Sequence, residues 1–216
     1  MPKISLDIKD IRVKLTRDYE TIFSCYHEAG HTVYALLHFV KVDNVYITES
    51  DGRVGGYTHF YSIDLSTIKD KKTLNKLIPI EIGINYAGLA ADKHTYELLC
   101  GSSTFPLLLQ GASTDLKNAS FLIRKYDFVP INLRNKFKKK MLLKVKNQLV
   151  HHWSVVTIVA HLLYKKKKIS YEDLKKEILK KVHNKMFWEN QFIMIEKIYT
   201  KIADQSITEQ ELDILY

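Results

Sequence analysis

Three features are scarce in this chain, and each scarcity excludes a class of protein. Its 216 residues include only two cysteines, Cys25 and Cys100, too few for the disulfide framework of a small secreted domain, so both are expected to be buried apolar residues. Eight glycines and four prolines exclude a collagen-like or linker-dominated chain. The longest apolar stretches, 77–91 and 153–164, carry polar residues and fall short of the ~20 residues that a membrane-spanning helix needs.

The terminal sequence and the charge limit location and partners. No apolar segment follows the first lysines, so we expect no secretory signal and a cytoplasmic protein. The chain has 33 Lys and Arg against 24 Asp and Glu, a net charge of +9 that attracts nucleic acid, anionic lipid or acidic protein. The excess is nearly all lysine, which suits solvated helix faces better than base and phosphate recognition. We therefore expect no nucleic-acid partner.

Hydrophobic periodicity predicts a mainly α protein of the α+β class, with one small strand pair near its start. Apolar residues at three- and four-residue steps predict a helix from about 18 to 40. β-branched and aromatic residues at 44–49 and 53–62 predict a hairpin or adjacent strands. Further helices are expected at 71–99, with Pro79 interrupting the first part, at 112–126, at 133–164 as one helix or a helical hairpin, and after Ser170, a good N-cap residue.

The remaining segments set the domain organisation. Residues 101–110 are expected to form a loop, and the lysine run at 165–168 a solvated turn. No linker or repeat divides the chain. We therefore expect one domain over 1–183, with an amphipathic helical extension over 184–216 packed on it.

One motif carries chemistry, the pentapeptide 27–31, which reads His-Glu-Ala-Gly-His. At 3.6 residues per turn, His27 and His31 share a face, so both imidazoles can reach one point beside the helix and bind Zn²⁺ there. Glu28 lies about 100° round the helix and flanks that point, where a carboxylate can take a proton from water. The alternative is that these are ordinary helix residues. A catalytic zinc site also needs a third protein ligand, and Leu37 stands where a metzincin-type site has a histidine, so carboxylates are the candidates.

Five segments, taken in order, carry a family resemblance, and the first of them contains the pentapeptide. They are residues 25–33 (CYHEAGHTV), 55–58 (GGYT), 87–92 (AGLAAD), 111–120 (GASTDLKNAS) and 168–174 (KISYEDL). In that order they resemble the zinc-binding helix, the substrate-pairing edge strand, the Gly-Gly-Arg-Ala-Ala-Glu helix, the Gly-Ala-x-x-Asp-Leu-x-x-Ala-Thr segment and the last peptidase helix of the FtsH proteases, which are membrane-anchored AAA+ metalloproteases. The likeness covers about 15–180, and its spread over separate motifs makes it more specific than the pentapeptide alone.

The resemblance implies the composition of a metal site. Zn²⁺ is bound by His27, His31 and Asp115, and Glu28 acts as the general base. Asp92 is expected to accept a hydrogen bond from a ligating imidazole, with a local cap or ion pair as an equal alternative. A rival assignment makes Asp92 the third ligand and Asp115 an ordinary first-turn carboxylate. Asp115 is preferred because the residues around it match the family better.

The resemblance also implies how substrate binds and what the chain lacks. An extended substrate is expected to pair as a strand with Gly55, Gly56, Tyr57 and Thr58, although two glycines also suit a bulge or turn. The chain departs from the family at Leu89, where the family has arginine, and at Asp92, where it has glutamate. It contains no Gly-x-x-x-x-Gly-Lys-Ser/Thr loop to bind ATP. We therefore expect the peptidase part alone, working either without ATP or with a separate ATPase.

Three functions are consistent with these observations. The first is a zinc-dependent endopeptidase that hydrolyses unfolded or loosely folded polypeptides. The second is a catalytically inactive relative of the FtsH peptidase that binds proteins. The third is a basic nucleic-acid-binding protein with a chance motif. The ligand types favour the first, with a polypeptide substrate and no membrane span.

Overall fold

The computed structural model describes residues 8–50, 53–61, 64–100, 112–204, 207–208 and 211, and the side chains of 8–17 and Cys100 lie outside this description. The expected loop at 101–110, Gly111 and the residues 51–52 between the two predicted strands also fall outside it. The elements in chain order are α1 (Ile8–Leu37), β1 (Val42–Ser50), β2 (Arg53–Phe60), α2 (Lys71–Cys100), α3 (Ala112–Lys125), η1 (Ile131–Leu133), α4 (Arg134–His151), α5 (Trp153–Lys166), β3 (Lys168–Ser170), α6 (Tyr171–Lys181) and α7 (Lys185–Ala203). The prediction of a mainly helical fold with a small sheet is confirmed.

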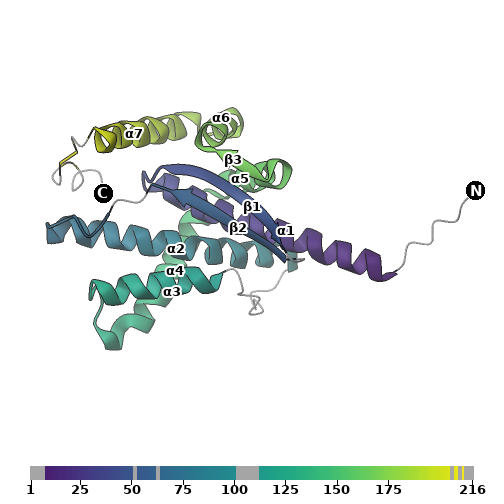
Figure 1. Ribbon diagram of the computed structural model, residues 1–216, viewed down its shortest axis with the longest axis horizontal. Helices are drawn as coiled ribbons and strands as arrows, with labels where there is room; N and C mark the ends of the chain where they lie inside the picture. The colour runs from purple at the N-terminus through teal and green to yellow at the C-terminus, as the bar shows by residue number, and fades with distance from the viewer. Residues whose placement is uncertain are drawn as a thin grey trace, which may run out of the picture.

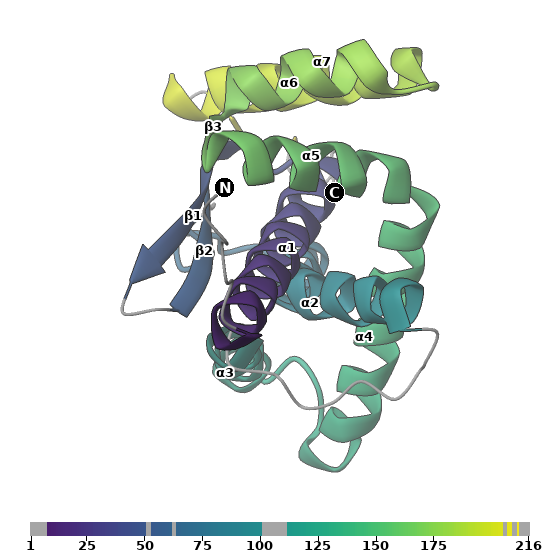
Figure 2. The same cartoon turned by 90° about the vertical axis from the view of Figure 1, so that its right-hand side faces the viewer.

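Helix α1 is the central element of the fold. Figure 2 shows it nearly end-on, with the sheet on one side, α5 above it and α2 crossing below. The helix can approach α2 closely because Gly30 faces it. A Cβ on Gly30 would lie 2.6 Å from the carbonyl oxygen of Ala87 and 2.7 Å from the Cβ of Ala91. The crossing therefore brings the pentapeptide 27–31 directly against the middle of α2.

Both long helices differ from the sequence prediction at their ends or interior. Helix α1 begins at Ile8, ten residues before the predicted start, and its first turns extend beyond the other elements in Figure 1. It ends at Leu37 rather than near 40, because Phe39 takes a left-handed conformation with φ 56° that stops the helix. Helix α2 continues through Pro79, where an interruption was expected. The proline removes one backbone donor there, and the helix tolerates that loss.

The sheet has three antiparallel strands in the order β2-β1-β3. The predicted strand pair is present, with Val45 opposite Thr58 and Tyr46 opposite Tyr57. The third strand, β3, was not predicted, because three residues are too few to show a period. Of the lysine run that was expected to form a turn, residues 165–166 end α5 and Lys168 begins β3. Within the described residues no strand pairs with the outer side of β2, which is therefore an edge strand.

The carboxyl-terminal third of the chain covers one side of α1 and the sheet. For 133–164 one helix or a helical hairpin was predicted. The structure has two helices, α4 and α5, which meet at His152 and run in different directions in Figure 2. Ser170 caps α6 as predicted, since its side chain accepts a hydrogen bond from the backbone N–H of Asp173. Helix α7 lies beside α6 and buries Trp188 and Phe192 in the hydrophobic core. None of the described helices is both long enough and apolar enough to cross a bilayer.

Replacing Phe192 by alanine tests whether α7 is part of the cooperative core. Phe192 is 1% exposed, so Phe192→Ala leaves a cavity and is expected to lower the free energy of unfolding by about 3–5 kcal/mol. Its neighbour Ile193 is 59% exposed, and Ile193→Ala is the matched control with an expected loss below about 1 kcal/mol. Urea unfolding followed by circular dichroism measures both. Equal small losses would show that α7 does not contribute to the core.

Candidate metal centre

Side chains from three helices and one strand converge beside the middle of α1. His27 and His31 come from α1, Asp92 from α2 and Asp115 from the first turn of α3. Strand β2 approaches from the remaining side, with Thr58 turned inward. Both imidazole side chains are nearly buried, at 10% and 8% exposure, and the Asp115 side chain is 21% exposed. Among the described residues the site is thus largely enclosed by protein, and Asp115 is its most exposed ligand residue.

Three atoms of this group lie at distances that suit one metal ion. The Nε2 atoms of His27 and His31 are 3.1 Å apart. Oδ2 of Asp115 lies 3.1 Å from Nε2 of His27 and 3.3 Å from Nε2 of His31. Tetrahedral coordination with bonds of 2.0–2.1 Å separates ligand atoms by roughly 3.3 Å. The two imidazoles and the carboxylate therefore form a preformed three-ligand set for a divalent ion.

The outer nitrogen of each ring is held by a separate acceptor. Nδ1 of His31 lies 2.7 Å from the backbone carbonyl oxygen of Ile84, which can only accept, so this nitrogen carries the hydrogen. Nδ1 of His27 lies 2.7 Å from Oδ2 of Asp92, a carboxylate that accepts the same way. In the neutral form of each ring, Nε2 then keeps its lone pair, and the two lone pairs are directed at the same point. This is the arrangement that orients histidines for metal binding.

The charges of the site favour a cation between the ligand atoms. Two imidazole lone pairs and a carboxylate oxygen repel one another at 3.1–3.3 Å unless a positive charge lies among them. The shifted pKa values of His27 and Asp115 have the same cause, because the site favours a positively charged imidazole beside a negatively charged carboxylate. Burial lowers the pKa of His27, but the charge of Asp92 and hydrogen bonds to Asp115 and Asp92 outweigh burial and hold it well above 6.5. Burial raises the pKa of Asp115, but hydrogen bonds to His27 and His31 outweigh it and lower the pKa well below its usual range.

A glycine on α2 leaves open the space that an ion would occupy. A Cβ on Gly88 would lie 2.4 Å from Nε2 of His27 and 2.5 Å from Nε2 of His31, close to the length of a metal–nitrogen bond. A side chain at this position would therefore compete with the ion for the same volume. The donor set, the distances and this open space all fit Zn²⁺, while the identity of the metal is not fixed by them.

Glu28 lies beside the metal ligands and is held in place by β2. The Oγ1 hydroxyl of Thr58 donates a 2.7 Å hydrogen bond to Oε2 of Glu28. The backbone of Gly56 packs against the same side chain. Oε1 accepts no hydrogen bond from the described residues, so one carboxylate oxygen is fixed and the other is available to take a proton.

The structure places the predicted site residues either at the metal centre or along β2. His27, His31 and Asp115 are brought together, and Glu28 lies close enough to His27 for its charge to raise the pKa of that imidazole. Asp92 lies behind His27 on the Nδ1 side, where it cannot also reach the point that the Nε2 atoms share. Of the four strand residues, Gly56 and Thr58 face Glu28, whereas Gly55 and Tyr57 alternate to the outer face, where Tyr57 is 52% exposed.

Sequence reasoning did not assign two parts of the centre. The Ile84 carbonyl left no signal, because any residue supplies that group. Gly88 did leave a signal: it precedes Asp92 by four residues and so shares its helix face. Thr58 was predicted to pair with substrate through the strand, and that stays a prediction; the hydrogen bond from its side chain to Glu28 was not predicted.

Removing each carboxylate separately distinguishes their roles in metal binding. Asp115→Ala deletes a ligand atom and is expected to weaken zinc binding more than about 100-fold. Asp92→Ala removes only the acceptor behind His27, for which a loss of about 10- to 100-fold is expected. Competition titration with a chromophoric chelator measures both, with the exposed Asp127→Ala as control. A larger loss for Asp92→Ala than for Asp115→Ala would reverse the assignment.

Adding one methyl group at Gly88 tests the space reserved for the ion. Gly88→Ala places a Cβ against both Nε2 atoms and is expected to reduce bound zinc from one equivalent to nearly none. Alanine is a better helix former than glycine by about 1 kcal/mol, so helix propensity does not oppose folding of this variant. Gly55→Ala is the control, since its Cβ would meet only Thr48 Oγ1 at 3.6 Å. Elemental analysis after dialysis and a thermal melt of each variant separate metal loss from unfolding. Full zinc binding by Gly88→Ala would exclude this location for the ion.

Comparison with known proteins assigns no family to the chain. No protein-family model matches it, and a search of curated proteins finds no match. The chemistry of the centre is therefore interpreted from its own geometry: two oriented imidazoles and a carboxylate around one point, with a second, separately held carboxylate beside them.

Proposed function

We propose that this protein is a zinc-dependent endopeptidase that hydrolyses unfolded or loosely folded polypeptides. The observation that carries the proposal is the convergence of His27, His31 and Asp115 on one point with Glu28 beside it. Metal-dependent hydrolysis needs a three-ligand site with an open position and a nearby base, and these residues can supply both. The resemblance of five segments to the FtsH peptidase adds support of a separate kind.

The residues of the site have distinct tasks in this mechanism. Zn²⁺ held by His27, His31 and Asp115 would supply Lewis acidity, which lowers the pKa of water and polarises a peptide carbonyl. Glu28 takes the proton of the attacking water on Oε1 and then gives it to the leaving amine. Thr58 keeps the carboxylate oriented through Oε2. Asp92 and the Ile84 carbonyl keep the imidazole rings in the tautomer that presents Nε2.

Strand β2 offers the route for the substrate. Its outer edge has no strand partner among the described residues, and Gly56 places that edge next to Glu28. An extended segment that pairs with this edge makes main-chain hydrogen bonds, which tolerate many sequences but require an unfolded segment. The chain has no phosphate-binding loop, so we propose cleavage of already unfolded chains, either without ATP or with a separate ATPase.

Two other chemistries fit the site less well. Two histidines and one carboxylate also bind Fe(II) in oxygenases. The buried Glu28 carboxylate, hydrogen-bonded 2.7 Å from Thr58 and placed beside the ligands, instead favours proton transfer during hydrolysis. Cysteine chemistry is disfavoured at Cys25, because burial raises the pKa of its thiol to about 11 and the side chain is only 1% exposed.

Replacing Glu28 by glutamine separates catalysis from metal binding. Glu28→Gln keeps the shape of the side chain but cannot take a proton, so casein cleavage is expected to fall at least about 100-fold while one zinc stays bound. Glu20→Gln, an exposed position on the same helix, should keep wild-type activity. Gel-based and fluorescent casein assays measure cleavage, and 1,10-phenanthroline should abolish it until zinc is added back.

Wild-type cleavage by Glu28→Gln would refute the mechanism. Stoichiometric zinc with no cleavage of any unfolded protein by the wild type would instead support a protein-binding module.

A further inference from the structure

The outer face of β2 has a gap next to the proposed scissile position. Gly56 and Thr58 face Glu28, so Arg53, Gly55 and Tyr57 alternate to the other face of the sheet. Gly55 has no side chain, and a Cβ there would meet only Thr48 Oγ1, at 3.6 Å. The row of outward side chains along β2 is therefore interrupted between Arg53 and Tyr57.

The gap forms an open hollow with a polar lining. Its volume is about 580 Å³, and it is lined by Thr48, Ser50, Arg53, Val54 and Gly55. Two hydroxyl side chains and one guanidinium group thus surround a space large enough for a side chain. Hydroxyl and guanidinium donors suit a carboxylate, which arginine can bind through two parallel hydrogen bonds.

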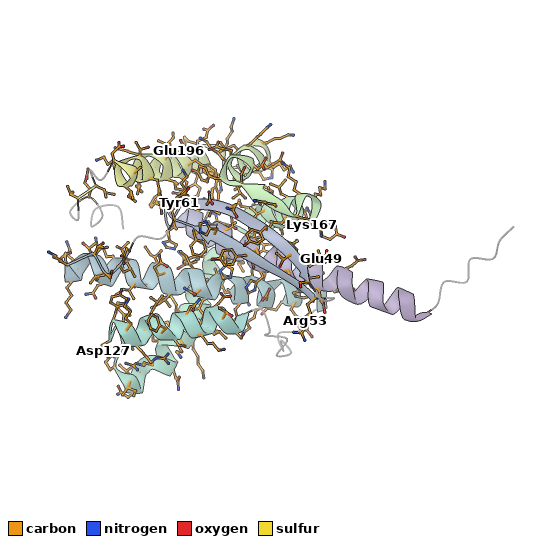
Figure 3. The ribbon with its side chains drawn as sticks, viewed as in Figure 1. Glu49, Arg53, Tyr61, Asp127, Lys167 and Glu196 are labelled. Carbon is orange, nitrogen blue, oxygen red and sulfur yellow. The ribbon has the colours of Figure 1, made fainter. Side chains whose placement is uncertain are left out.

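Arg53 is available for such an interaction. Figure 3 shows it at the same end of the hairpin as Glu49. Glu49 lies 3.9 Å from the amino group of Lys167 on the chain between α5 and β3. In the described part of the chain no carboxylate forms an ion pair with Arg53. Among the described residues, the guanidinium group of Arg53 thus has no ion-pair partner at the hollow.

The hollow lies within reach of a substrate bound at Glu28. A strand rises about 3.3–3.4 Å per residue, so Arg53 lies roughly 10 Å along β2 from Gly56, which packs on Glu28. An extended substrate paired with the edge of β2 directs alternate side chains to the outer face. A side chain one to three residues from the bond beside Glu28 would enter the hollow.

We propose that the hollow formed by Thr48, Ser50, Arg53 and Gly55 is a specificity subsite that binds an acidic side chain of the substrate, one to three residues from the cleaved bond. The proposal rests on the proposed peptidase function. It adds a substrate class: unfolded segments that carry Asp or Glu on one side of the cleavage point.

A glutamate scan of one peptide tests the subsite. Unstructured fluorogenic peptides with one cleavable bond carry a single Glu, Ala or Lys at each position from three residues before the bond to three residues after it. In the wild type, Glu at a position on one side of the bond should raise kcat/KM about fivefold over Ala, which corresponds to one partly exposed charged hydrogen bond. Arg53→Ala should remove this preference, and Arg53→Glu should reverse it in favour of Lys.

A second cation on the same face controls for general attraction by a basic protein. Lys168 lies opposite Tyr46 on β3, which is separated from β2 by β1. Lys168→Glu therefore makes the same charge change away from the hollow. It should leave the Glu preference intact. Equal loss of preference in Arg53→Glu and Lys168→Glu, or no dependence on the position of Glu, would overturn the subsite.

Peptide binding to the zinc-loaded Glu28→Gln variant separates this inference from the proposed function. Fluorescence anisotropy should show tighter binding of the preferred Glu peptide, and the double variant with Arg53→Glu should lose it. Cleavage without charge preference would overturn the subsite and leave the peptidase intact. Arg53-dependent binding without cleavage by the wild type would keep the subsite and overturn the peptidase. Neither cleavage nor binding would overturn both.

Discussion

Mutual repulsion among three electron-pair donors is the constraint around which the centre of this fold is built. The Nε2 atoms of His27 and His31 and Oδ2 of Asp115 face one another at 3.1–3.3 Å in a largely buried place. Such a group is favourable only when a positive charge lies among the three atoms, either a metal ion or a proton on an imidazole. Each donor is positioned by the packing of the helices. The close crossing of α1 and α2 at Gly30 brings the histidines against α2, where the Ile84 carbonyl orients His31. The first turn of α3 positions Asp115. The packing of the core and the chemistry of the site are thus the same set of contacts.

The two nearby aspartates show how one ring can assign different tasks to similar groups. An imidazole has two nitrogens on opposite sides, and each can have one partner. Asp92 contacts Nδ1 of His27 and orients the ring. Asp115 lies on the Nε2 side, where its carboxylate can bind a metal ion together with Nε2. Glu28 is kept separate from both by its hydrogen bond to Thr58. Three carboxylates therefore lie close together and contact three different groups: Nδ1 of His27, the Nε2 atoms, and the Thr58 hydroxyl.

The sequence predicted best what local geometry controls. Two histidines four residues apart on a helix must share a face, so their convergence followed from spacing alone. The meeting of Asp115 with them depends on the packing of α3, 88 residues along the chain from His27, and only the family resemblance pointed to it. Strand β3 was missed because its three residues form a strand only through pairing with β1. The early start of α1 was missed although Ile8, Ile11 and Leu15 continue the three- and four-residue steps of apolar residues to the amino end of the helix.

The unpaired edge of β2 has a consequence for how copies of this protein meet one another. Main-chain groups that can pair with any extended polypeptide can also pair with the same edge of a second molecule, which is how sheets grow into aggregates. The edge is poorly suited to that: two adjacent glycines weaken its strand propensity, and a charged arginine stands at its start. The net charge of +9 on each molecule also opposes the approach of a second copy. The two glycines and the arginine of β2, which we propose to serve substrate binding, therefore also disfavour edge-to-edge aggregation of the protein.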